Sequence, residues 1–157
     1  MDAQRYYEDV EVGQPLVERV VTPTRRLAVQ FAGASGDFYE IHYDKDFAIQ
    51  AGFPDVIVHG AQKAAFITQM LTSWMGLDGV LKKVRCSFRG VDFFGVALTC
   101  NGKVTAKHIE GNQHCVTREV WMDNARGVRT TLGGGVVVLP SRAGMRVNQP
   151  QRAGERR

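Results

Sequence analysis

The segment SGDFYEIH, from Ser35 to His42, contains a carboxylate and an imidazole five residues apart. An aspartate and a histidine on one tight loop can converge on a small molecule and move protons to and from water, which accelerates a reaction by about 10²–10⁴-fold. Near neutral pH an aspartate acts as a base, whereas a histidine acts as acid or base. An aspartate and a histidine near a loop are more often a helix cap and a structural imidazole, so the spacing of Asp37 and His42 alone makes them only a candidate acid–base site.

A second candidate lies at Val58-His59-Gly60, directly before a long apolar pattern. Gly60 is predicted to lie in the first turn of a helix, where backbone N–H groups lack an intrahelical acceptor and face the positive end of the helix dipole. One such donor can stabilise the oxygen of a thioester carbonyl as it gains negative charge, and this contributes about 10²–10³-fold in rate. The alternative is that Gly60 only permits close packing. His59, next to it, is a candidate for the wall of the substrate pocket.

The elements that must position these residues follow from local patterns. The segment 15–22 is rich in β-branched residues, which predicts a strand. Residues 25–35 are predicted to form a short helix that begins after a capping threonine and ends at Gly36. Residues 43–52 are predicted to form a second short helix that a glycine closes. The Asp37–His42 loop therefore connects two helices.

Residues 60–75 carry the clearest helical pattern, since apolar side chains recur at a period near 3.6. The polar side chains, Gln62 and Lys63 among them, fall on the remaining positions. From residue 79 the period changes to two, which predicts four antiparallel strands. These strands are expected over residues 81–90, 96–107, 113–123 and 128–140.

Two details of the strands are specific enough to test. Alternation in 96–107 predicts one buried face, made of Val96, Leu98, Cys100, Val104 and Ala106. Three consecutive glycines, residues 133–135, are unfavourable in a strand and indicate a bulge or a close backbone contact. One long helix with few helical neighbours can bury its apolar face only against a sheet that curls around it. The fold class is therefore α+β, although the periodicities alone do not select one topology.

The segments FAGASGDFYEIHYDKDFA (31–48) and VIVHGAQKAAFITQML closely resemble the MaoC-like dehydratases, a family that includes the R-specific enoyl-CoA hydratases. The matching positions are Ser35, Gly36, Asp37, His42 and Ala48, and the resemblance extends over about residues 8–140. It implies a single hot-dog domain, in which a curved antiparallel sheet wraps around one central helix. It also implies a site at or near a dimer interface.

The resemblance further implies that the chain adds water to a trans-2-enoyl-CoA, or removes it. Asp37 and His42 would then activate the water and protonate C2, and the backbone N–H at Gly60 would polarise the thioester carbonyl. The sequence does not divide acid from base within the pair. No cofactor is expected, because coenzyme A is part of the substrate; an acyl-carrier-protein thioester is an alternative substrate.

The chain departs from the family between the two catalytic positions, where Tyr39-Glu40 replaces the usual Asn-Pro. Tyr39 is therefore a candidate pocket residue that selects the acyl group. For the coenzyme A phosphates, alternation in 81–90 places basic side chains on one face of the strand, and these are also compatible with ordinary solubility. The candidates for this contact are Lys83, Arg85 and Arg89.

Composition narrows the remaining possibilities. The net charge of +4 comes from the segment 141–157, which holds five arginines and one glutamate, so the body 1–140 is neutral. We therefore expect a single domain over 1–140, a basic, solvated and disordered tail over 141–157, and no nucleic-acid partner. The chain has no apolar run near the ~20 residues that a membrane span needs and its first residues do not resemble a secretory signal, so a cytoplasmic location is expected.

The cysteines show no metal-binding spacing. They are expected to be reduced and buried. His108 and His114, which flank the turn 109–113, are expected to have no Cys or His partners at the spacing that a zinc site needs, so no metal is expected. The three cysteines are Cys86, Cys100 and Cys115.

The leading hypothesis is a hydro-lyase of lipid metabolism that acts on acyl thioesters. Two alternatives stay open: an acyl-CoA thioesterase, and a non-catalytic hot-dog subunit that completes a partner's site. Apolar positions on the strands favour a homodimer or larger homo-oligomer, and a hetero-oligomer with another hot-dog chain is the alternative assembly.

Overall fold

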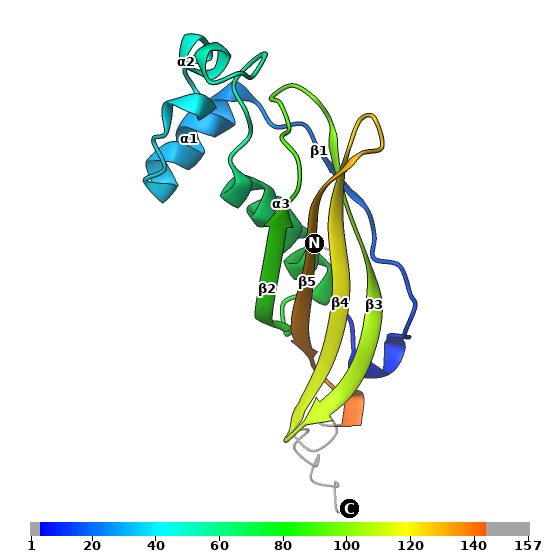
Figure 1. The fold of residues 1–157 in the computed structure, drawn as a ribbon. Helices are drawn as coiled ribbons and strands as arrows, with labels where there is room; N and C mark the ends of the chain where they lie inside the picture. The colour runs from blue at the N-terminus through cyan, green and yellow to red at the C-terminus, as the bar shows by residue number, and fades with distance from the viewer. Residues whose placement is uncertain (1–3, 144–157) are drawn as a thin grey trace, which may run out of the picture.

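A computed structural model describes residues 4–143 of the 157-residue chain (Figure 1). The elements, in chain order, are η1 (Tyr7–Asp9), β1 (Arg19–Val21), α1 (Arg25–Ser35), η2 (Glu40–His42), α2 (Lys45–Gln50), α3 (Gly60–Met75), β2 (Val80–Phe88), β3 (Leu98–Glu110), β4 (Gln113–Asn124) and β5 (Arg129–Leu139).

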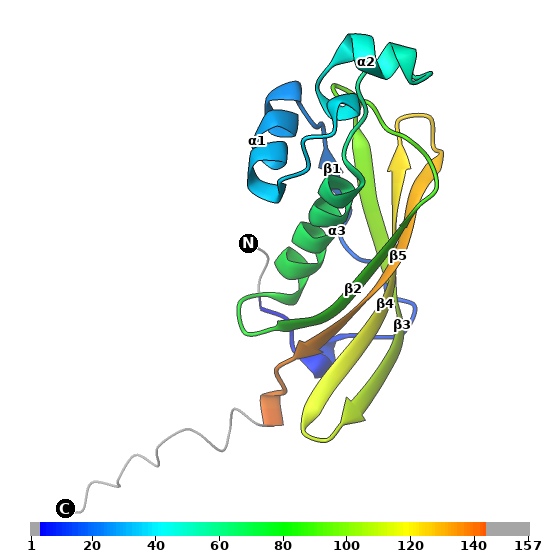
Figure 2. The same ribbon diagram turned by 60° about the vertical axis from the view of Figure 1, so that its left-hand side comes forward.

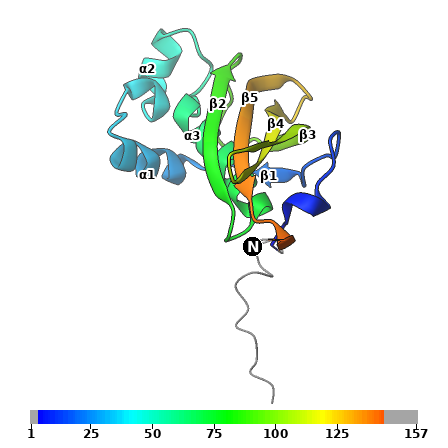
Figure 3. The ribbon, with the colours of Figure 1, turned by 90° about the horizontal axis from the view of Figure 1, so that it is seen from below.

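The strands form one antiparallel sheet in the order β1-β3-β4-β5-β2. Figure 2 shows α3 lying against one face of this sheet, with α1 and α2 beside the N-terminal end of α3. Seen from below, the sheet curves around α3 (Figure 3). The predicted α+β class and the predicted hot-dog arrangement are both confirmed.

The core lies between α3 and the concave face of the sheet. Ile67, Leu71 and Trp74 of α3 are at most 2% exposed and belong to one apolar cluster with Leu98 and Val120 of the sheet. Burial of each such side chain stabilises the fold by about 1.5–3 kcal/mol. This packing fixes the axis of α3 and therefore the position of its first turn.

The sequence predicted α3 at its observed bounds and α1 at its observed bounds. The hydroxyl of Thr24 accepts the N–H of Leu27, which caps α1, and Gly36 ends the helix at a φ of 76°, a conformation that favours glycine. The strand predicted at 15–22 is shorter than expected. Regular pairing is limited to β1, and Pro15, which has no N–H to donate, makes only an isolated bridge to Lys103.

The glycines at 133–135 allow close contacts between backbone and neighbours. A Cβ atom on Gly133 would lie 2.3 Å from the carbonyl oxygen of Arg85, and one on Gly135 would lie 2.9 Å from Leu71. Cys86 and Gly133 pair in regular register, so the close contact is confirmed and a bulge is absent there.

A bulge does occur in β3, between Val104 and Ala106. It ends the predicted alternation, because Leu98, Cys100 and Val104 are buried as expected but Ala106 is exposed. Val96 precedes the strand and is 39% exposed, so its predicted burial is also wrong.

The three cysteine thiols are free, with Cys100 and Cys115 buried and Cys86 half-buried. Desolvation raises the pKa of Cys100 to about 12. Within residues 4–143 no helix combines the length and apolar character needed to cross a bilayer.

The start of the predicted tail contacts the domain. Arg142 pairs with Asp9 at 2.6 Å, and the hydroxyl of Ser141 donates to Glu8. The rest of the predicted tail, 144–157, lies outside the described residues.

Candidate active site

Three segments meet at the N-terminal end of α3. Asp37 follows the C-cap of α1, His42 ends the short η2 turn, and His59 and Gly60 begin α3. Two backbone hydrogen bonds hold the segment that leads into α3. The N–H of Ile57 donates to the backbone carbonyl of Ile41, and the N–H of Val58 donates to the backbone carbonyl of Asp92. The start of α3 is thereby fixed against the loop that carries Asp37 and His42.

The ring of His42 is oriented by a backbone carbonyl. Its Nδ1 atom lies 2.8 Å from the oxygen of Ile57, which can only accept a hydrogen bond, so Nδ1 carries the hydrogen. The Nε2 atom is therefore unprotonated in the neutral ring and lies 3.9 Å from the carboxylate of Asp37. That separation exceeds a direct hydrogen bond, and one water molecule can contact both groups.

Asp37 and His42 differ in their exposure to solvent. The side chain of Asp37 is 45% exposed, whereas His42 as a whole is 8% exposed. The carboxylate is thus accessible to solvent, whereas the imidazole is nearly enclosed by protein. The structure brings the two predicted residues together, with the base-competent nitrogen directed at the carboxylate.

Gly60 lies in the first turn of α3, as predicted. The N-cap residue, His59, makes no side-chain cap, so the first N–H groups of the helix keep their capacity to donate to another acceptor. A Cβ atom at Gly60 would lie 2.9 Å from the ring of Phe88. The glycine is therefore needed for close packing, the alternative raised above, and its position also suits an oxyanion donor.

Tyr39 lies beside the imidazole and is 52% exposed. Its ring meets those of His42 and Phe47 edge-on, at centroid distances of 6.3 and 5.5 Å. This placement is compatible with the predicted role in the pocket wall. His59 is 0% exposed and stacks on the ring of His42, so the structure does not place it in the wall of a pocket.

The predicted basic residues do not all lie near this site. Lys83 and Arg85 are exposed on the face of β2 opposite Val84, whereas Phe88 packs against Gly60 on the α3 side. Arg85 lines a shallow depression of about 490 Å³ on its own face of the sheet. Lys83 and Arg85 of this chain are therefore separated from Gly60 by the sheet, and the exposed Arg89 follows directly after Phe88.

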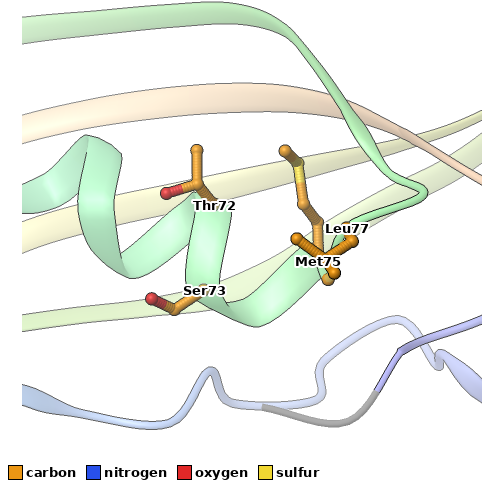
Figure 4. A pocket seen from close by; sticks show the side chains of 5 residues that line it. Thr72, Ser73, Met75 and Leu77 are labelled. Carbon is orange, nitrogen blue, oxygen red and sulfur yellow. The ribbon is translucent and has the colours of Figure 1, made fainter. Parts of the chain in front are cut away.

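A different depression, of about 240 Å³, lies at the other end of α3 (Figure 4). Its lining comes from the last turn of the helix and the residues after it, and contains none of the candidate site residues. The lining residues are Thr72, Ser73, Met75, Gly76 and Leu77.

Ligand atoms of Asp37, His42 and His59 lie within 4.8 Å of one another. The contact of His42 Nδ1 with Ile57 leaves Nε2 free, as in many metal ligands, but the Nε2 atom of His59 is engaged by the backbone carbonyl of Asp37 at 3.3 Å and is not free to bind an ion. The free nitrogen of His59 is enclosed by protein.

The expectation that His108 has no cysteine partner is wrong, because β3–β4 pairing places Cys115 opposite it. Glu110 completes a second cluster with these two residues. The ammonium group of Lys82 lies 2.7 Å from Glu110 and supplies a positive charge there already.

Sequence reasoning missed a buried ion pair below the first turn of α3. Lys63 and Gln62 are each 1% exposed, contrary to the expected outward positions. The ammonium group of Lys63 donates to Asp92 and to the carbonyl of Gly90, each at 2.8 Å, and the hydroxyl of Thr130 donates to Asp92 at 2.6 Å. The only signal in the sequence is a charged residue in the apolar segment VDFFGV, and it does not name a partner.

This chain is similar to a known protein family and to two named proteins. Residues 9–125 match the MaoC like domain family. The chain is 28% identical over 96 residues to the 3-oxo-4,17-pregnadiene-20-carboxyl-CoA hydratase beta subunit of Mycobacterium tuberculosis, a match that covers 60% of this chain and 74% of that protein. It is 34% identical over 88 residues, 55% of its length, to fatty acid synthase subunit beta of Gibberella zeae, and spans 4% of that much longer protein.

This chain also superimposes on a solved structure. The (R)-hydratase from A. caviae involved in PHA biosynthesis superimposes with a TM-score of 0.77 at 27% identity, over 85% of this chain and 99% of that one. The family match extends over most of the chain and includes the Asp37–His42 loop and the start of α3. The chain belongs to the MaoC-like dehydratase family and has its hot-dog fold.

Proposed function

We propose that the chain hydrates a trans-2-enoyl thioester, or dehydrates the corresponding 3-hydroxyacyl thioester. The observation that carries the proposal is the orientation of His42, whose Nδ1 is held by Ile57 at 2.8 Å and whose Nε2 faces Asp37 at 3.9 Å. A carboxylate and a neutral imidazole on opposite sides of one water molecule form an acid–base pair suited to this reaction.

The reaction balances with one water and no other reactant. The water oxygen bonds to C3 while the pair removes a proton, and the electrons of the C2–C3 double bond move toward the thioester oxygen. C2 then receives a proton from the pair, which returns the site to its starting state. A free N–H of the first turn of α3 donates to the thioester oxygen while it carries negative charge.

The proposed substrate is an acyl-CoA, with an acyl-carrier-protein thioester as the alternative, and the proposed setting is lipid metabolism. Names of the relatives support this setting, since one is a CoA-ester hydratase subunit and another is part of a fatty acid synthase. Among the basic residues, Arg89 is the candidate for a substrate phosphate, because it is exposed and is adjacent in sequence to Phe88, whose ring lies beside Gly60.

The proposed assembly contains at least two hot-dog chains. Strand β2 pairs with β5 on one side, and its other edge has no strand beside it within residues 4–143. Val80 on this edge strand is 61% exposed. An unpaired edge with exposed apolar side chains is suited to association, with a second copy or with a different hot-dog chain.

A second candidate is a subunit that completes a partner's site, because the related Mycobacterium tuberculosis protein is named as a beta subunit. A third is a thioesterase, because the carboxylate of Asp37 is 45% exposed to water.

Ultraviolet absorbance with crotonyl-CoA and with longer or polycyclic enoyl-CoAs distinguishes the three. Hydration removes the enoyl band without releasing a thiol. If the wild-type protein and H108A show this reaction and D37N and H42A do not, hydration at the candidate site is supported. Thiol release supports the thioesterase, and no reaction without an added partner chain supports the subunit.

A further inference from the structure

His59 is enclosed at the junction between α3 and the catalytic loop. It is 0% exposed, and its ring stacks on that of His42 with centroids 3.8 Å apart and an interplanar angle of 22°. The ring of Phe31, from α1, meets His59 at 5.1 Å. The imidazole of His59 therefore covers one face of the His42 ring and limits its movement.

A hydrogen bond connects His59 to the other catalytic residue. The Nε2 atom of His59 lies 3.3 Å from the carbonyl oxygen of Asp37, which can only accept, so this nitrogen carries the hydrogen. The Nδ1 atom is buried and has no partner among the described residues. A second proton there would have no acceptor, so the ring is neutral.

Electrostatics agrees with this assignment. Burial lowers the pKa of His59 below its ordinary value of 6.5, and the neighbouring His42 lowers it further. A neutral ring can stack on His42 without the repulsion that two imidazolium ions would suffer.

The position of His59 in the helix matters as well. Ser, Thr, Asp and Asn are preferred at an N-cap because their side chains accept the N–H groups of the first turn. His59 occupies the N-cap of α3 and makes no such bond, since its side chain is committed to Asp37. The first-turn N–H groups are thereby left for an external acceptor.

We propose that His59 is a positioning residue that aligns the two catalytic groups with the start of α3. It holds Asp37 through the backbone carbonyl and His42 through ring stacking, while leaving the first-turn N–H groups uncapped. This role rests on the proposed hydratase function, and it explains why a histidine occupies this enclosed position.

Two substitutions separate the two contacts. H59F keeps an aromatic ring against His42 but cannot donate to Asp37. H59Q keeps a donor but loses the ring, and glutamine, unlike asparagine, is not a preferred N-cap that would occupy the first-turn N–H groups. Misplacement of a catalytic group by about 1 Å lowers rates by up to ~10²-fold, so each variant is expected to lower kcat roughly 10- to 100-fold while KM stays within about threefold. H108N, at an exposed histidine, is the control for loss of an imidazole.

A purely structural role would lower the amount of folded protein and leave kcat per folded molecule unchanged, which would overturn the proposal. A rise in KM at constant kcat would also overturn it, because His59 would then contact substrate.

A nitrogen-15 NMR measurement on the wild-type protein tests the geometry without activity. The expected spectrum shows His59 as the Nε2–H tautomer and His42 as the Nδ1–H tautomer, with His59 protonated only at a lower pH than an ordinary imidazole. In folded H59F and H59Q the signals of the His42 ring or the Asp37 loop are expected to shift. An Nδ1–H tautomer, or a His59 pKa above the ordinary value of 6.5, would overturn the proposal even if the chain proves to be a hydratase. If the expected tautomers are found but no hydration occurs, the proposed function fails and the geometry stands.

Discussion

The Nε2 atom of His42 lies 3.9 Å from the carboxylate of Asp37, because the carbonyl of Ile57 holds the opposite side of the imidazole at 2.8 Å. The carbonyl sets the tautomer, and the tautomer leaves a lone pair directed at the space beside Asp37. A five-residue loop thus becomes an acid–base site only through a contact with the segment that begins α3.

Replacement of His42 by glutamine is expected to test this orientation. Glutamine can keep a donor toward Ile57, so the variant should fold, but it has no base at the position of Nε2. We expect kcat to fall by about 10²–10⁴-fold. Steady-state kinetics beside a thermal melt measures both quantities, and retained activity in folded protein would contradict the assigned role.

A methyl group at Gly60 is expected to destabilise the protein. Its Cβ would lie 2.9 Å from the ring of Phe88, and such overpacking costs about 1–3 kcal/mol. G33A is the matched control, because Gly33 lies in α1 with nothing within 4 Å of its added Cβ and should gain about 0.5–1 kcal/mol. Urea unfolding measures the free energies.

The contribution of Phe88 can be isolated in the same experiment. If the ring is the obstacle, G60A should cost little in an F88A background. An equal cost in both backgrounds would place the strain elsewhere.

The buried ion pair between Lys63 and Asp92 is expected to be strongly coupled. Their side chains are 2% and 1% exposed, so K63M or D92N leaves an uncompensated buried group and should lower the free energy of unfolding by about 3–5 kcal/mol. The double variant K63M/D92N should lose much less than the sum of the two. Additive losses in a double-mutant cycle would show that the pair does not interact as the distances indicate.

Stability is expected to depend on pH through His59. Its pKa is lowered in the folded protein, so below about pH 6.5 the unfolded chain binds a proton that the folded protein excludes. This effect makes unfolding easier as the pH falls, by at most about 1.4 kcal/mol per pH unit, and it is absent at higher pH. H59F lacks it.

The free energy of unfolding of the wild type minus that of H59F should therefore decrease from pH 7.5 to pH 5.5. Chemical denaturation at several pH values measures this difference. If this value instead increases as the pH falls, folding raises the pKa of His59.

Local patterns account for the parts of the fold that were predicted correctly. The bounds of α3 follow from a period of 3.6 and from Gly76, which ends the helix at a φ of 80°. The bulge that exposes Ala106 depends on how β3 pairs with β4, and no feature within one strand encodes it. Burial of Lys63 is likewise invisible in the helical pattern, because its partner Asp92 lies 29 residues away.

Part of the candidate site could likewise be predicted from one segment, and part depends on contacts between segments. Asp37 and His42 are close in sequence, so their proximity could be predicted from one loop. The stacking of His59 on His42 requires two segments to dock through Ile57, and the sequence therefore placed His59 in a pocket wall that it does not reach.

Mass spectrometry of the reaction in H₂¹⁸O tests the central claim most directly. The wild-type protein with crotonyl-CoA is expected to give an intact 3-hydroxyacyl-CoA that carries one ¹⁸O atom, and D37N and H42Q should give none. An ¹⁸O atom in a free carboxylic acid, with coenzyme A released, would contradict hydration at the Asp37–His42 site and identify hydrolysis of the thioester in its place.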